Sequence, residues 1–308
     1  MRILIVANHN TGSFSPFVVE QVNAIRQLGI DVDYYGIHGK GVFGYLSNLN
    51  ALKKKIREYH PNLIHAHYGL SGLLANLQRE IPVVTTYHGS DIHSRGLNLF
   101  LSRIAIRLSA YNIFVSEGLQ ILSGYRGKKQ CVQPCGVDFK TFFPIEREEA
   151  RKKLGWDADG KYILFASSFD NKVKNSPLAK AAVSQIENGR LIELRGYNRD
   201  QVNWAINAAN CMLMTSFREG SPQVVKEALA CGTPIVSVNV GNVNDYCMGV
   251  EGCYITSYNI DDIVEKLHQA LSFKGKTQGR THILQKQLDN ELIAKNIRSI
   301  YEKICKTY

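Results

Sequence analysis

Short apolar runs alternate with longer amphipathic stretches along the chain, first over residues 1–133 and again from residue 161 onward. This alternation is typical of βα units, which pair their strands in parallel. In the first series we expect strands at 3–7, 32–36, 63–67, 83–87 and 112–116, and a short extended piece at 131–133. The helices between them are expected at 17–28, 46–59, 71–79, 97–109 and 117–123.

A second series follows the segment PCGVDFKTFFPIEREEARKKLG, whose prolines and glycine indicate a linker. Its strands are expected at 162–166, 191–195, 212–215, 235–238 and 253–255. Its helices are expected at 177–186, 200–208, 222–230, 260–271 and 294–306. The sequence therefore predicts an α/β protein with two Rossmann-like domains in tandem, and a single doubly wound domain with insertions is the alternative.

Composition narrows the class of protein. The 308 residues hold no apolar run long enough to span a membrane, and the first residues, MRILIVAN, predict a strand rather than a signal peptide. The seven cysteines include no CxxC and no metal-type spacing. They are expected to be small buried side chains in a reducing compartment, so we expect a cytoplasmic protein.

The net charge of +10 is concentrated in the first half of the chain. Residues 1–145 carry 15 Lys/Arg and 8 Asp/Glu, whereas residues 146–308 carry 22 and 19. This surplus suggests an anionic partner such as a phosphate or an acidic membrane surface. Nucleic acid is not expected, because no recognition motif accompanies the charge. The chain also lacks a P-loop, a GxGxxG after its first strand, an HExxH and a GxSxG.

Histidines gather near the ends of two predicted strands. His65 and His67 are two residues apart in one strand, so their side chains point to the same face, and His88 and His93 follow the next strand. A zinc site is one interpretation. The sequence favours a polar pocket instead, because open α/β sheets bind ligands at the carboxyl ends of their strands.

Two loops that follow strands carry groups suited to a phosphate. Gly12 and Ser13 come after the first strand, where glycine permits close backbone approach and the start of the next helix attracts anions. Lys172 and Lys174 follow the first strand of the second series and offer positive charge. An ordinary turn and solvated lysines are the alternatives.

The stretch REGSPQVVKEALACGTPIV holds two acids eight positions apart, Glu219 and Glu227. Ser221 is expected to cap a helix that begins at Pro222, and the amides around Gly220 would then attract an anion.

Glu227 lies inside the mostly apolar helix, where an unpaired carboxylate is costly to bury. A ligand with paired hydroxyls and a phosphate, such as a nucleotide sugar, would supply the missing hydrogen-bond donors. Pairing with Lys226 at the surface is the alternative.

These motifs together resemble one family. SFREGSPQVVKEALACGTPIVSVNVG resembles the E-x7-E signature of the family 4 retaining glycosyltransferases, which have the GT-B fold, two Rossmann-like domains with a cleft between them. HPNLIHAHYGLSG and VVTTYHGSDIH resemble two loops of the family's first domain, VQPCGVDFKTFFP its interdomain segment, and FDNKVKNSPLAKAAV its lysine loop. The resemblance covers most of residues 1–250, and the bacterial polysaccharide-biosynthesis members are the type it suggests.

The resemblance implies roles for individual residues. The catalytic set would be Glu219 and His88, which orient the transferred sugar, and Lys174, which neutralises the leaving diphosphate. Glu227 would hold the ribose hydroxyls. The other groups expected around the donor are Gly12, Ser13, Lys172, Gly220, Ser221 and Pro222. His67 and Asp91 are expected on the acceptor side.

The resemblance also implies partners and domain limits. The donor would be a nucleotide diphosphate sugar and the acceptor a sugar or a lipid-linked sugar, with no metal and no further cofactor. The first domain would comprise residues 1–142 and the returning C-terminal helix, about 290–308, and the donor domain would comprise residues 143–289. The sequence departs from the family at Ser167 and Ser168, in the region where many members carry an arginine, and Lys172 could replace the charge of that arginine.

Two functional alternatives stay open at this stage. The first is a degenerate member that binds a partner or a nucleotide without turnover, and the second is a GT-B sugar-nucleotide epimerase. Membrane contact is a further question. Phe43, Leu46, Leu49, Leu52 and Ile56 lie near helical spacing beside Lys53, Lys54, Lys55 and Arg57, and the stretch LFLSRIAIRLSAY adds Arg103 and Arg107. The apolar side chains form either a membrane-facing surface at the inner face of the membrane or the core side of an ordinary amphipathic helix.

Overall fold

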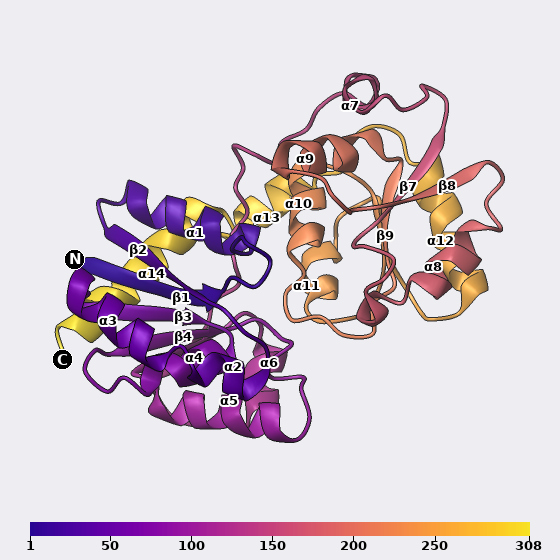
Figure 1. Cartoon of the computed structure of the whole chain (residues 1–308). Helices are drawn as coiled ribbons and strands as arrows, with labels where there is room; N and C mark the ends of the chain where they lie inside the picture. Colours follow the sequence, from indigo (N-terminus) through magenta and orange to yellow (C-terminus); the bar gives the residue numbers. More distant parts are fainter. The chain divides into compact units, whose positions relative to one another are not determined.

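The computed structural model describes residues 1–308, which fold as two compact units (Figure 1). Unit 1 comprises Met1–Gly136 and Asn290–Tyr308, and unit 2 comprises Val137–Asp289. From the sequence, we expected the first domain to end at residue 142 and the chain to return to it near residue 290. Each unit is a parallel sheet with helices on both faces, as the alternating pattern predicted.

Unit 1 holds a six-stranded sheet of order β2-β1-β3-β4-β5-β6. Its strands are β1 (Arg2–Asn8), β2 (Asp31–Ile37), β3 (Leu63–His67), β4 (Val83–Tyr87), β5 (Tyr111–Phe114) and β6 (Gln130–Val132). Its helices are α1 (Pro16–Gln27), α2 (Gly41–Leu46), α3 (Leu49–Tyr59), α4 (Gly69–Asn76), α5 (Leu97–Leu108), α6 (Glu117–Ser123) and α14 (Asn290–Cys305).

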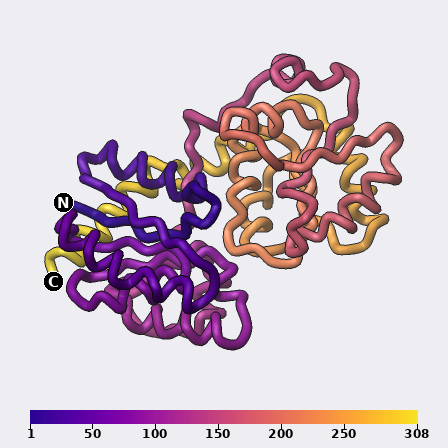
Figure 2. The backbone as a smooth tube through the Cα atoms, in the orientation of Figure 1, coloured from indigo at the N-terminus to yellow at the C-terminus, as the bar shows by residue number.

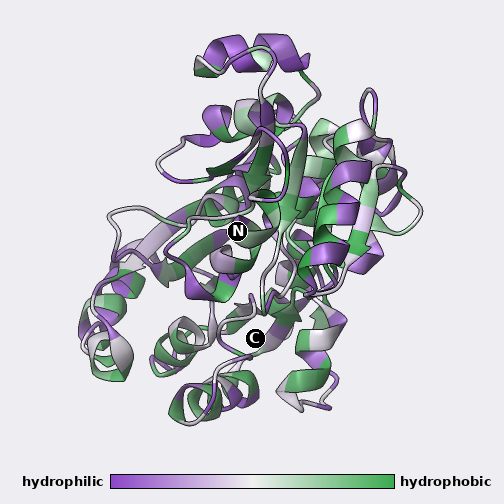
Figure 3. Ribbon diagram, turned by 90° about the vertical axis from the view of Figure 1, so that its right-hand side faces the viewer, coloured by the Kyte–Doolittle hydropathy of each residue, from purple (hydrophilic) through white to green (hydrophobic).

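Alternate residues of the central strands enter two separate cores. In β1, Ile3 and Ile5 pack with α1 and α14, whereas Leu4 and Val6 pack with α3 and α4. Successive side chains of a strand point to opposite faces, so a strand covered on both faces is apolar throughout. Figure 3 accordingly colours the strands mainly green and gives many helices both green and purple sides.

Unit 2 holds a five-stranded sheet of order β11-β10-β9-β7-β8. Its strands are β7 (Lys161–Phe165), β8 (Gly189–Glu193), β9 (Cys211–Met214), β10 (Ile235–Val238) and β11 (Cys253–Thr256). Its helical elements are α7 (Arg147–Leu154), the 3-10 turn η1 (Lys172–Lys174), α8 (Ser176–Val183), α9 (Arg199–Ala208), α10 (Gln223–Cys231), α11 (Val243–Cys247), α12 (Ile260–Ser272) and α13 (Gly279–Gln285). Every expected strand is present with ends within two residues. Helices α11 and α13 were not predicted, and α7 lies in the segment that was interpreted as a linker.

The helix expected at 46–59 is α3, which begins only at Leu49, and the preceding α2 was not predicted. The Asn48 side chain lies between them and donates to the carbonyl oxygens of Gly44 (2.6 Å) and His38 (2.8 Å), which holds the break. Leu52 and Ile56 are buried against the sheet. The apolar side of α3 is therefore a core face rather than a membrane-facing surface, whereas Phe43 in α2 is 89% exposed.

Two further sequence expectations concern cysteines and membrane spans. All seven cysteines are free, and Cys135, Cys211, Cys231 and Cys247 are buried. None of the helices combines the length and apolar character that crossing a bilayer would require.

The last helix of the chain lies in unit 1, beside α1 and close to the N-terminus (Figure 2). It contributes Ile293, Ile297 and Tyr301 to the core, and the Tyr301 hydroxyl lies 2.5 Å from Nδ1 of the fully buried His65. Nε2 of His65 lies 2.7 Å from the Thr86 hydroxyl. Both ring nitrogens are therefore satisfied, so a neutral imidazole can be buried here without an unpaired polar atom.

We expect Tyr301→Phe to destabilise unit 1 by about 1–3 kcal/mol, because a buried ring nitrogen would lose its partner. Hydrogen exchange at the amides of β3 measures this locally. Tyr308→Phe, at a side chain that is 70% exposed, is the matched control. Equal protection of β3 in the two variants would contradict the assigned role.

The stability of unit 1 should also fall with acid. Burial lowers the pKa of His67 to about 3, and burial together with the neighbouring His67 and His88 rings lowers the pKa of His65 further below its usual range. The unfolded chain takes up these protons near pH 6.5 and the folded chain does not. Stability is therefore complete above pH 6.5 and falls below it.

The expected decline is about 1.4 kcal/mol per pH unit for each histidine. Urea unfolding between pH 6.5 and 5, where ordinary carboxylates remain ionised, measures it. His67→Asn should reduce the slope, and an unchanged slope would show that His67 is not the responsible group.

Candidate active site

The loop between β9 and α10 carries the two acids of the motif. The structure places Pro222 as the N-cap residue in an extended conformation, and α10 begins at Gln223. The expectation that Ser221 caps a helix starting at Pro222 is wrong, because the Ser221 hydroxyl lies 2.7 Å from the Tyr246 hydroxyl instead. A proline at the cap still leaves the following amides of α10 pointing toward this loop as a site for an anion.

A second loop closes on this one. A Cβ built on Gly241 would lie 2.8 Å from the carbonyl oxygen of Gly220, and Gly241 has a φ of 58°. Both observations require glycine at this position. The loop that follows β10 therefore packs directly against the backbone of the motif at Gly220, with no room for a side chain between them.

Glu219 and Lys174 lie together, as their predicted roles at one ligand require. Lys174 Nζ lies 2.6 Å from Glu219 Oε1, and the two side chains are only 20% and 11% exposed. The lysine loop is anchored to the end of β9, since the Phe217 amide donates to the Val173 carbonyl oxygen (2.9 Å). The Thr215 hydroxyl also donates to the carbonyl oxygen of Lys174 (3.0 Å). Lys172, by contrast, is exposed.

Glu227 is buried, so its pairing with Lys226 at the surface is excluded. Its Oε1 accepts from a guanidinium nitrogen of Arg199 at 2.6 Å. Arg199 is the first residue of α9 and lies over the Phe142 ring, 4.5 Å from its centroid. A buried carboxylate requires such a charged partner, and this pair supplies it.

Sequence reasoning missed Arg199. A signal was available, because Arg199 follows β8 just as Lys174 follows β7, and loops after parallel strands meet at one edge of the sheet. The same loop carries Arg195, which pairs with Asp170 at 3.4 Å, and Ser168 donates to Asp170 at 2.6 Å. Positive charge thus lies near the position where the family often has an arginine, and it comes from the neighbouring strand.

Unit 1 brings the predicted histidines together in a stack. His67 Nδ1 lies 3.0 Å from His88 Nε2, and the rings of His65 and His67 are 4.5 Å apart. No group of three His, Cys, Asp or Glu side chains is placed to hold a metal ion. The nitrogens of His65 are already used by Tyr301 and Thr86, so the arrangement favours the polar pocket over the zinc interpretation.

Asp91 organises the loop that follows β4. Its Oδ1 accepts from the amides of Gly89 (2.9 Å) and Ile92 (3.0 Å), and its Oδ2 accepts from the amide of Gly69 (3.2 Å). Burial raises the pKa of this carboxyl, although the amide hydrogen bonds oppose the shift. Asp91 therefore connects the loops after β3 and β4, and so helps to position His88.

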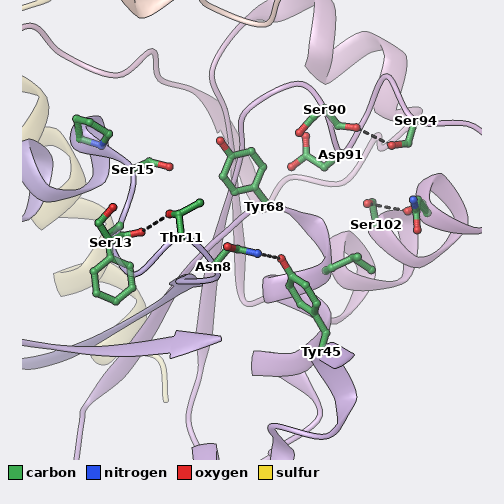
Figure 4. A pocket seen from close by; sticks show the side chains of 14 residues that line it. Asn8, Thr11, Ser13, Ser15, Tyr45, Tyr68, Ser90, Asp91, Ser94 and Ser102 are labelled. Atoms are coloured by element: carbon green, nitrogen blue, oxygen red, sulfur yellow. Dashed lines mark hydrogen bonds between the residues drawn. The ribbon is translucent and has the colours of Figure 1, made fainter. Parts of the chain in front are cut away.

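A pocket of 600 Å³ opens where β1, β3 and β4 end (Figure 4). Its wall is rich in hydroxyl and amide groups, and its ionisable carboxyl is Asp91. The residues that line it are Asn8, Thr11, Ser13, Phe14, Ser15, Pro16, Tyr45, Tyr68, Leu70, Ser90, Asp91, Ser94, Asn98 and Ser102. Such a wall suits a ligand with many hydroxyl groups.

Of the site residues predicted for unit 1, Ser13 and Asp91 line this pocket. Gly12 precedes Ser13 in the same loop and has a φ of 80°. Tyr45 was missed, because its short helix α2 was not predicted. Its hydroxyl accepts from the Asn8 amide at 2.8 Å.

Two glycosyltransferase family models match the chain. A family model described as Glycosyltransferase Family 4 matches residues 20–141, and a model described as Glycosyl transferases group 1 matches residues 161–272. Together they cover more than half of the chain.

Two curated relatives illustrate the similarity. The teichuronic acid biosynthesis glycosyltransferase TuaC of Bacillus subtilis is 26% identical over 82% of this chain and 73% of its own length. The D-inositol 3-phosphate glycosyltransferase of Nocardiopsis dassonvillei is 24% identical over 69% of this chain. The chain spans 63% of the length of this second relative, less than two thirds.

Solved structures share the fold. A sucrose-phosphate synthase from Thermosynechococcus elongatus superposes with a TM-score of 0.85 at 17% identity and covers all of both chains. HepE from Anabaena, solved in complex with UDP and glucose, gives a TM-score of 0.75 at 15% identity over 98% of this chain and 100% of its own. The two family models match both halves of the chain, and its two parallel sheets are those of the solved structures. The chain therefore belongs to the family 4 glycosyltransferases and has the GT-B fold.

Proposed function

We propose that the protein transfers a glycosyl unit from a nucleotide diphosphate sugar to an acceptor hydroxyl, with retention at the anomeric carbon. The observation that carries this proposal is the pair of ion pairs around the start of α10, Lys174 with Glu219 and Arg199 with Glu227. Cations and helix amides suit a diphosphate, and carboxylates suit the hydroxyls of a sugar and a ribose. That HepE was solved with UDP and glucose supports a nucleotide sugar as donor.

In the proposed reaction, the bond between the anomeric carbon and the diphosphate oxygen breaks as the acceptor oxygen forms its bond on the same face. Lys174 and the amides of α10 stabilise the negative charge that develops on the diphosphate. The departing phosphate oxygen takes the proton of the acceptor hydroxyl. Glu219 and His88 orient the sugar, so catalysis is mainly positioning and electrostatics.

The diphosphate charge is met by protein cations in this proposal, and the transfer therefore needs no metal ion or other cofactor. Gly220, Ser221, Pro222, Gly12 and Ser13 would border the donor. Lys172, which is exposed beside Lys174, would add charge at the edge of the site.

The acceptor is proposed to bind unit 1, where the hydroxyl-rich pocket, the end of β3 at His67 and the loop of Asp91 lie. A sugar or lipid-linked sugar of cell-surface polysaccharide, lipopolysaccharide or glycolipid synthesis fits this wall. Such an acceptor and the free cysteines are consistent with work in the cytoplasm, in contact with the anionic inner face of the membrane.

We expect Lys174→Ala and Glu227→Ala each to weaken binding of UDP-glucose by roughly ten- to a hundredfold, because each removes a charged hydrogen-bonding group. Isothermal titration calorimetry measures the affinity, after a thermal-shift screen over nucleotide sugars has identified the best donor. Lys152→Ala, at an exposed lysine of α7 in the same unit, is the control. Unchanged affinity in both site variants would refute the assignment.

We expect Arg199→Gln to lower both the stability of unit 2 and the affinity for the donor, because Glu227 would lose its charged partner. A cost of about 1–3 kcal/mol is reasonable for a pair whose arginine is partly solvated. Arg190→Gln removes an exposed arginine of β8 whose ion pair with Asp157 lies at the surface, and it should change neither quantity appreciably. Thermal unfolding and calorimetry measure the two variants side by side, and equal behaviour would contradict a special role for Arg199.

A further inference from the structure

The outer face of α5 combines apolar and basic side chains that remain uncovered. Leu97 and Phe100 are 61% and 58% exposed, and Arg103 and Arg107 are exposed as well. Their spacing of three to four residues places all four on one side of the helix. The opposite side, represented by Ala105 and Ile106, is buried.

Next to this face lies a pocket of 480 Å³ that the proposed transfer does not use. It is formed by α5, by the end of α6 and by the loop at 124–127, and it is lined by Arg103, Ile106, Arg107, Ser123, Gly124, Tyr125, Arg126 and Gly127. Three arginines thus converge on one cavity within unit 1.

None of these arginine side chains has a hydrogen bond or an ion pair within the protein. Residues 81–133 hold six Lys/Arg and two acids, of which Asp91 is buried among backbone amides. Unpaired like charges around one cavity repel one another, and an anion between them removes that repulsion. The planar guanidinium fork matches the oxygens of a phosphate.

The neighbouring apolar side chains indicate where this phosphate comes from. On α6, Ile121 and Leu122 are 78% and 45% exposed, and they precede the pocket residue Ser123 directly. Exposed aliphatic side chains beside the arginines would not contribute to the binding of a small anion from water. They suit a bilayer surface, where anionic headgroups and acyl chains occur together.

We propose that Arg103, Arg107 and Arg126 bind the phosphate of an anionic lipid headgroup, while Phe100 and Ile121 enter the apolar part of the same leaflet. This proposal deepens the proposed function and rests on it for the identity of the acceptor. The same helix α5 supplies Asn98 and Ser102 to the 600 Å³ pocket. Its 12 residues span about 18 Å, so the lipid surface would hold a lipid-linked sugar close to that pocket.

The first test is co-sedimentation of the full chain with vesicles of phosphatidylcholine, with and without phosphatidylglycerol. We expect salt-sensitive binding only when phosphatidylglycerol is present. The triple variant Arg103→Gln, Arg107→Gln and Arg126→Gln should bind these vesicles roughly a hundredfold more weakly, because each arginine near an anionic surface contributes about fivefold. The matched control, Lys53→Gln, Lys54→Gln and Arg57→Gln, removes the same charge from α3.

The second test separates a lipid from a soluble phosphate. Phe100→Ser with Ile121→Ser should weaken vesicle binding by about tenfold or more, because less apolar surface enters the leaflet. Unchanged vesicle binding in this variant would overturn the lipid assignment in favour of a soluble phosphate. Equal loss in the arginine triple and in the α3 control would overturn the pocket itself, leaving only general charge.

Binding of UDP-glucose without lipid distinguishes failure of this proposal from failure of the proposed function. All these variants should retain wild-type donor affinity and melting temperature, because the altered side chains lie in unit 1 and are exposed, apart from the half-buried Lys53 of the control. A wild-type protein that binds vesicles but no donor would refute the proposed transfer while leaving the lipid site standing.

Discussion

Parallel pairing of every strand is the constraint on which both units depend. Parallel strands need a crossover after each strand, and the crossovers bury both faces of the sheet under helices. All loops that follow strands therefore emerge at one edge. In unit 2 this edge collects Lys174, Arg199, Glu219 and Gly241 from four different loops. In unit 1 the same rule gathers the loops of Ser13, Tyr68 and Asp91 around one pocket.

The burial of Glu227 shows how the fold sustains a costly group. An ionised carboxyl in an apolar helix would be prohibitive by itself, but Arg199 reaches it from the start of α9. The ion pair holds the buried carboxylate in place within α10. His65 in unit 1 follows a similar logic with neutral partners, since Tyr301 and Thr86 satisfy both of its nitrogens. The return of α14 to unit 1 thus completes a polar cluster as well as a core.

The two pockets of unit 1 differ in charge. The 600 Å³ pocket is lined by hydroxyl and amide groups, whereas the arginines of α5 and of the loop after α6 line a different cavity. A neutral, hydroxylated ligand and an anionic one would therefore be sorted to different sides of the same helix. The basic surplus of the first half of the chain is explained better by this second cavity than by α3, whose apolar side is core and whose Lys54 and Lys55 pair with Glu58 and Asp33.

The sequence by itself determined the elements and the motif. Apolar runs such as Ile3–Ala7 and the spacing of Glu219 and Glu227 are local properties, so the strands, the βα order and the acidic pair could be predicted from them. Tertiary structure alone decided which side chains meet. Arg199 reaches Glu227 across 28 residues, and Tyr301 reaches His65 across 236. Such pairings depend on strand order and helix packing, which no local pattern encodes. The start of α3 after Asn48 and the cap at Pro222 also required the fold, because hydrogen bonds with neighbouring segments overrode the local preference for an earlier helix start and for a serine cap.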